Sequence, residues 1–307
     1  MKRPLTDRRA PAESPLCDTK PTICRAADNA GDIPAALARL TVAEDACRAI
    51  NRCNLPTAAL ASLAFQLAPV PLELDGVLPL HRPLFDRLAE IDDAAARADL
   101  FQTYVGAHFL LDDAPAQGLS PHPRIDRSRL DYLRVLRGWL FDADGREAAV
   151  LKGWVESRFG VLARFHREPI DDRDGAARAA FDHELAAGLY ATGALEAQLD
   201  LLYAFAQHEL ARRLPGRRHV TLYRGYSGRH AIEPLATLPD GRAVVLLNNL
   251  SSFSASRERA DEFGDHVIAC DVPLAKIAAF SRLLPGRLQG EDEYLVIGGV
   301  VAVLRIA

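Results

Sequence analysis

Hydrophobic residues recur every three or four positions through the first two-thirds of the chain, which is the spacing of one helix face. Ala, Leu, Arg and Glu dominate residues 33–214, so this region is predicted to be mainly helical. The clearest runs are Leu151, Val155, Phe159 and Leu162, with Trp154 on their flank, and Leu195, Leu199, Leu202, Ala206 and Leu210. Prolines break the helices at 69–83, which includes the turn pair Asp75-Gly76, and at 113–124.

The pattern changes near Pro215-Gly216, where short runs of β-forming residues between turns replace the helical spacing. The candidate strands are 219–223, 243–247, 266–272, 294–297 and 300–306. The last two are predicted to form a hairpin across Gly298-Gly299. A short amphipathic helix is predicted around 256–263, between the second and third strands.

Because helices come first and strands follow, we expect an α+β fold with a helical N-terminal region and a mostly antiparallel β core. No strand is followed by the G-x-G-x-x-G sequence of a Rossmann unit. Residues 1–30 are rich in Pro, Arg, Asp and Ala without apolar periodicity, and we interpret them as a flexible arm. Residues 31–215 then form the helical region, and residues 216–307 the β-rich core.

Composition narrows the class of protein. The 307 residues are 49% hydrophobic and 25% charged, typical of a globular protein, and the net charge of -4 argues against nucleic-acid binding. No apolar run is long enough for an integral membrane segment, and the N-terminus lacks the apolar stretch of a secretory signal, so a cytoplasmic location is expected. The five scattered cysteines contain no C-x-x-C pair, so we expect neither a disulfide framework nor a metal site.

Three short segments of the C-terminal third carry the candidate chemistry. The first is Arg224-Gly225 at the end of a predicted strand, the second is 251–254 with its serines, and the third is the acidic triplet 291–293. Taken singly, each has an ordinary interpretation: a surface arginine, a helix cap by Ser254 or Ser256, and a solvated turn. However, Glu291 and Glu293 are two residues apart, so in an extended strand both side chains point to the same face.

Together the segments resemble the Arg–Ser–Glu class of arginine-specific mono-ADP-ribosyltransferases. In that superfamily one strand carries the arginine, a later strand carries Ser-x-Ser before a helix, and a late Glu-x-Glu begins another strand. Here Ser252-Phe253-Ser254 is followed by Ala260 and Phe263, which fits the helix, although Phe253 replaces the usual central threonine. The resemblance implies an ADP-ribosyltransferase-type β core and NAD as the co-substrate.

The same resemblance assigns roles to individual residues. Glu293 would stabilise the positive charge that develops on the ribose as nicotinamide leaves, and Glu291 would orient the acceptor guanidinium and accept its proton. Arg224 would hold NAD through a phosphate or the adjacent ribose, and Ser252 would orient Glu293 or shape the nicotinamide pocket. The remaining residues assigned to the NAD site are Gly225, Ser254, Tyr223, Tyr226 and Phe253, the last three as candidates for stacking on nicotinamide.

A narrower resemblance covers most of the chain from about residue 45. Residues 51–56, Ser62, Phe65-Gln66, 74–77 and 80–85 resemble the N-terminal half of the dinitrogenase reductase ADP-ribosyltransferase family, bacterial enzymes that switch off nitrogenase. This resemblance implies the nitrogenase iron protein as acceptor. It also implies a PII-type nitrogen regulator as a possible partner of the helical region. We further expect the helical region to form one wall of the NAD cleft and to recognise the protein acceptor.

Other functions remain open on the sequence alone. The chemistry could be the same with a different protein acceptor, or water could replace arginine, which would make the protein an NAD glycohydrolase. A non-catalytic NAD-binding module is a further alternative. The pair of aligned acids argues against it, because simple binding does not need two carboxylates.

Overall fold

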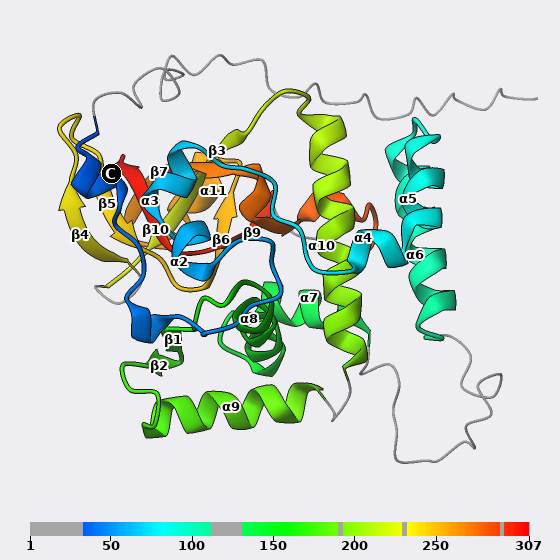
Figure 1. Ribbon diagram of the computed structural model, residues 1–307, viewed down its shortest axis with the longest axis horizontal. Helices are drawn as coiled ribbons and strands as arrows, with labels where there is room; N and C mark the ends of the chain where they lie inside the picture. The colour runs from blue at the N-terminus through cyan, green and yellow to red at the C-terminus, as the bar shows by residue number, and fades with distance from the viewer. Residues whose placement is uncertain (1–32, 112–130, 190–192, 229–231, 289–291, 307) are drawn as a thin grey trace, which may run out of the picture.

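The computed structural model describes residues 33–111, 131–189, 193–228, 232–288 and 292–306 (Figure 1). Helices occupy the N-terminal part and an eight-stranded sheet follows, so the predicted α+β fold is confirmed. The helices are α1 (Ala35–Ala38), α2 (Thr57–Leu60), α3 (Leu63–Leu67), α4 (Val77–Leu80), α5 (Arg82–Ala89), α6 (Ala94–His108), α7 (Tyr132–Phe141), α8 (Arg146–Phe159), α9 (Ala176–Leu189), α10 (Ala194–Arg213) and α11 (Arg257–Asp261). Short 3₁₀ turns occur at η2 (Glu44–Ala46), η4 (Leu274–Lys276) and η5 (Ser281–Leu283).

The two clearest helical patterns correspond to α8 and α10, whose apolar faces are buried. Leu162 lies beyond the end of α8, because Gly160 takes a left-handed conformation and stops the helix. The break predicted at 69–83 is shorter than expected, since α4 begins directly after the turn at Gly76 and α5 accommodates Pro83 in its first turn. The arm at 1–30 and the break at 113–124 lie outside the described residues.

The sheet has the order β4-β5-β10-β7-β3-β6-β9-β8, and neighbouring strands among the described residues are antiparallel. Its strands are β3 (His219–Tyr226), β4 (Glu233–Thr237), β5 (Ala243–Leu246), β6 (Leu250–Ser254), β7 (His266–Pro273), β8 (Ile277–Phe280), β9 (Glu293–Ile297) and β10 (Val300–Arg305). A separate small pair is β1 (Phe165–His166) with β2 (Glu168–Pro169). The apolar runs did not predict β4, β6 or β8.

The hairpin predicted across Gly298-Gly299 is wrong. β9 pairs with β6 and β8, whereas β10 pairs with β5 and β7. The two glycines form a corner, at which Gly298 N donates to Asn249 O (2.9 Å) and Leu247 N donates to Gly299 O (3.1 Å). Strand pairing therefore continues through this bend, from the β6–β9 pair on one side to the β5–β10 pair on the other. A Cβ atom at 298 would lie 1.8 Å from the Asn248 carbonyl oxygen, which explains the glycine there.

Helices and sheet share one large hydrophobic core, which includes Trp139 of α7 and Phe253 of β6. In Figure 1, α10 lies beside the sheet, and α5 and α6 lie on the far side of α10. α7 packs against α8 and α10, so the last turn of α7 comes to the edge where β3, β6 and β9 meet. Within the described residues, no helix combines the length and the apolar character needed to cross a membrane.

Candidate active site

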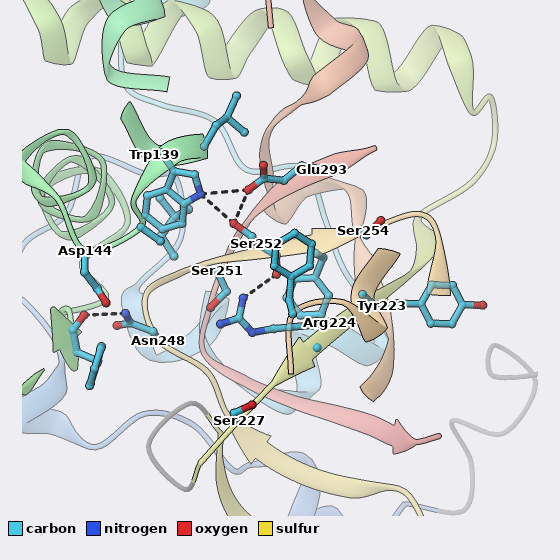
Figure 2. Close-up of a pocket in the computed structure, with 18 of the residues that line it drawn as sticks. Trp139, Asp144, Tyr223, Arg224, Ser227, Asn248, Ser251, Ser252, Ser254 and Glu293 are labelled. Atoms are coloured by element: carbon cyan, nitrogen blue, oxygen red, sulfur yellow. Dashed lines mark hydrogen bonds between the residues drawn. The ribbon is translucent and has the colours of Figure 1, made fainter. Parts of the chain in front are cut away.

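A cavity of about 830 Å³ lies between the end of α7 and the strands β3, β6 and β9 (Figure 2). Its volume is in the range of small-molecule and cofactor sites. The three sequence segments meet there, because Arg224, Ser252, Ser254 and Glu293 all line this cavity. Glu291 lies outside the described residues.

Glu293 begins β9 and is held by two donors. Its Oε1 accepts a hydrogen bond from the Ser252 hydroxyl at 2.5 Å and one from the Trp139 indole Nε1 at 3.3 Å. Burial raises the pKa of the Glu293 carboxyl, while Ser252, Trp139 and the nearby Arg224 charge act in the opposite direction. The result is a partly desolvated carboxylate whose direction is fixed by hydrogen bonds.

Arg224 lies on β3 beside the serine segment and is half-buried. Its Nη1 donates to the main-chain carbonyl of Ser252 at 2.7 Å, and its Nε is buried without a hydrogen-bond partner among the described residues. Burial lowers the pKa of Arg224, and the charges of Glu293 and Asp144 oppose that change. A half-buried guanidinium with an unused, buried Nε donor is suited to an anionic or hydroxyl-bearing ligand.

Ser254 and Gly225 serve the local structure of the same wall. The Ser254 hydroxyl accepts from Ser256 N (3.0 Å), and Ser256 is the N-cap of α11, with its hydroxyl accepting from Arg259 N at 3.1 Å. Ser256 is therefore the helix cap, which the sequence had left open between the two serines. A Cβ at Gly225 would lie 1.8 Å from the Ala260 carbonyl oxygen, so glycine at 225 allows α11 to pack closely on β3.

The three aromatic candidates lie in different surroundings. Tyr223 and Phe253 line the cavity, but Phe253 is only 2% exposed and belongs to the core. Figure 2 shows the Tyr223 ring directed away from the Arg224 guanidinium. Tyr226 is not among the residues that line the cavity, and its ring lies 5.4 Å from that of His266.

The helical region was expected to form one wall of the cleft, but sequence reasoning did not identify the residues that line the cavity from it, Trp139, Asp144 and Lys152. Lys152 is 2% exposed, and its Nζ donates to Asp144 Oδ1 (2.8 Å) and to Phe165 O (3.1 Å). Burial lowers the pKa of Lys152, and the Asp144 carboxylate opposes the change. A buried lysine in a helical pattern resembles a surface residue in sequence, so no local signal identifies it.

The chain is similar to a known protein family. The family described as "Dinitrogenase reductase ADP-ribosyltransferase" matches residues 50–304. A curated relative from Rhodospirillum rubrum, "NAD(+)--dinitrogen-reductase ADP-D-ribosyltransferase", is 40% identical over 256 residues, which cover 81% of this chain and 91% of the relative. No solved structure was found to match the chain.

Proposed function

The chain belongs to the dinitrogenase reductase ADP-ribosyltransferase family, and we propose that it transfers ADP-ribose from NAD to an arginine of the nitrogenase iron protein. The name of the R. rubrum relative gives both the donor and the acceptor protein. The observation that carries the proposal is the Glu293 carboxylate, held by Ser252 near Arg224 in a cavity of suitable size.

Glu293 acts on the bond between nicotinamide and ribose. As that bond breaks, positive charge develops on the ribose, as it does in glycoside hydrolysis. An ionised Glu293 would accept a hydrogen bond from the ribose 2′-hydroxyl and stabilise this charge. The hydrogen bond from Ser252 fixes the carboxylate before NAD binds, so little reorganisation is needed in the transition state.

The residues on β3 and β6 would bind NAD. Arg224 offers its unused Nε and its positive charge to a phosphate or the adjacent ribose. Ser252 orients Glu293, while Ser254 and Gly225 support the wall behind it. Of the three stacking candidates, Tyr223 and Phe253 line the cavity and Tyr226 does not.

Glu291 would determine the acceptor. A guanidinium is a poor nucleophile at neutral pH, because its pKa is above about 12. A carboxylate beside it can orient it and accept its proton as the new bond forms. Glu291 lies two positions before Glu293 and is the residue proposed for this task. Its carboxylate is the feature that favours an arginine side chain as the acceptor over water or another side chain.

The helical region would recognise the protein acceptor and dock a PII-type regulator. Its contribution to the cavity through α7 supports the first of these roles.

A cytoplasmic location is proposed together with the acceptor, and the free thiols of Cys47, Cys53 and Cys270 are compatible with a reducing compartment. The division into a helical region at 31–215 and a β-rich core at 216–307 is part of this proposal.

The test uses radiolabelled NAD with purified iron protein and either wild-type enzyme, Glu293→Ala or Glu291→Gln. Wild-type enzyme should label the iron protein, Glu293→Ala should not, and the exposed Glu168→Ala should behave as wild type. Release of nicotinamide without label on any protein would identify a glycohydrolase. Label on other proteins but not on the iron protein would identify another acceptor, and arginine transfer by Glu291→Gln at the wild-type rate would contradict the role of Glu291.

A further inference from the structure

Trp139 connects the helical region directly to the carboxylate on β9. Its indole Nε1 donates to the Ser252 hydroxyl oxygen at 2.8 Å and lies 3.3 Å from Glu293 Oε1 (Figure 2). The side chain is 3% exposed. It comes from a part of the chain 154 positions before Glu293, so no feature of the local sequence near the glutamate announces it.

Helix α7, whose last turn carries Trp139, is fixed from several sides. Asp131 caps the helix, and Gln198 of α10 accepts a hydrogen bond from Tyr132 N at 3.0 Å. Arg137 reaches the carbonyl oxygen of Arg287 at 3.2 Å, in the segment that leads toward β9. α7 therefore contacts both Glu293 and the chain that approaches it, and the indole N–H is held in place before any ligand binds.

We propose that Trp139 is a positioning residue for the reaction, which fixes the Ser252 hydroxyl and the Glu293 carboxylate in the orientation that stabilises charge on the ribose. The inference rests on the proposed function, because it needs Glu293 as the catalytic carboxylate. Trp139 itself need not touch the reacting atoms. Its action on the reaction passes through Ser252 and Glu293.

The direction of the hydrogen bonds supports this role. Indole Nε1 can only donate, so the Ser252 oxygen accepts from it, which leaves the single hydroxyl proton of Ser252 for Glu293. The three groups form a chain that runs from the indole through the hydroxyl to the carboxylate, and such chains strengthen each member bond. Without the indole, the Ser252 hydroxyl can rotate toward other acceptors.

Other charges near this chain act on it from neighbouring elements. Arg224 on β3 attracts the Glu293 carboxylate, and Asp144 and Lys152 act in turn on Arg224. Lys152 Nζ lies 5.8 Å from the Trp139 ring centroid, on the side of the cavity formed by α8. We expect these groups to stay in place when Trp139 is replaced by phenylalanine, so that a change in the titration or activity of Glu293 can be assigned to the lost N–H.

The chain offers a matched control, because it contains two tryptophans. Trp154 of α8 is 2% exposed, and its Nε1 donates to the Asp200 carboxylate at 2.7 Å. Trp154 packs against Phe159 and Tyr203 and does not line the cavity. Trp139→Phe and Trp154→Phe each remove one indole N–H from a carboxylate, but only the first carboxylate belongs to the proposed active site.

Labelling of the iron protein is measured with each variant over a range of pH and NAD concentration. For Trp139→Phe we expect kcat to fall about tenfold to a hundredfold, the effect of losing one hydrogen bond to a charged group, with the KM for NAD changed far less. The acid limb of the kcat profile should move to higher pH, because loss of this donor raises the pKa of Glu293 further. Trp154→Phe should keep the wild-type kcat and pH profile.

Wild-type kcat and an unchanged pH profile in folded Trp139→Phe would overturn the inference. The inference would also be overturned if Trp139→Phe and Trp154→Phe lost activity equally and each loss followed that variant's loss of stability. Should Trp139→Phe fail to fold, Trp154→Phe leaves Trp139 as the sole tryptophan, and its fluorescence should change on titration with NAD. Constant emission through saturation overturns the inference, whereas absence of labelling by wild-type enzyme contradicts the proposed function instead.

Discussion

Arg224 donates to the main-chain carbonyl of Ser252 at 2.7 Å, while the hydroxyl of Ser252 donates to Glu293. A single residue of β6 therefore sets the positions of both the positive and the negative group of the site. Tyr223 of β3 pairs with Ser254, and Ser254 pairs with Glu293, so the sheet brings the three strands together at this point. The geometry of the proposed site depends on the main chain of β6 as much as on its side chains.

Replacement of Arg224 by lysine should weaken NAD binding although the charge is kept. A guanidinium can hold the Ser252 carbonyl and still present Nε to a ligand, whereas one ammonium group cannot reproduce that planar fork. We expect kcat/KM for NAD to fall about tenfold to a hundredfold. Steady-state kinetics measure this, with Arg242→Lys on the β4–β5 turn as a control that should remain active. Wild-type kinetics in Arg224→Lys would contradict the binding role.

The activity should depend on the ionisation of Glu293. Burial holds the pKa of this carboxyl above its ordinary value of 4.5, and only the ionised form stabilises positive charge. kcat should therefore decline as the pH falls through a value above 4.5. Glu293→Gln should lower kcat by about a hundredfold or more, and its residual rate should lack that acid limb. An acid limb that persists in the variant would assign the titration to another group.

The sequence predicted those parts of the fold in which local pattern and tertiary packing agree. The faces of α8 and α10 follow from the spacing of Leu151, Val155 and Phe159 and of the later leucines, because each face packs on the shared core. Arg224, Ser252 and Glu293 were recognisable from the order of three motifs along the chain. These features need no knowledge of which strand lies beside which.

The features that sequence reasoning missed depend on contacts between distant residues. Trp139 meets Glu293 across 154 positions, and a tryptophan in an amphipathic helix is indistinguishable from ordinary core. The Gly298-Gly299 pair resembles a hairpin turn locally, but the partner of each following strand is chosen elsewhere in the sheet. Gly225 was assigned to the NAD site, whereas a Cβ at this position would meet the carbonyl oxygen of Ala260 in α11.

Gly298→Ala should destabilise the corner of the sheet. The added Cβ would lie 1.8 Å from the Asn248 carbonyl oxygen, and neither backbone can move without disturbing the β5–β10 and β6–β9 ladders. The free energy of unfolding should drop by about 1–3 kcal/mol or more, as in other overpacked sites. Gly193→Ala, where a Cβ meets nothing within 4 Å, is the control and should change it much less. Urea unfolding with an unchanged m-value measures both, and equal effects would disprove the steric account.

Lys276 should make stability depend on pH at the same corner. It is 1% exposed, its Nζ donates to Gly298 O at 2.9 Å, and burial lowers its pKa from 10.5 to about 8. Between pH 8 and 10.5 the unfolded chain therefore holds a proton that the folded protein has released, so the free energy of unfolding should rise with pH in this window. The buried Cys270 thiol, with its pKa raised from 9.0 to about 12, acts in the opposite direction.

Lys276→Met separates the two effects, because Cys270 is present in both proteins. The free energy of unfolding of the wild type, relative to that of the variant, should increase as the pH rises from 8 to 10.5. Urea unfolding at a series of pH values measures this difference directly. A difference that stays constant across the window would mean that Lys276 titrates at its ordinary value, so that burial at the corner does not perturb it. The increase arises only if the folded protein holds Lys276 neutral beneath Gly298 at pH values where the unfolded chain keeps it charged.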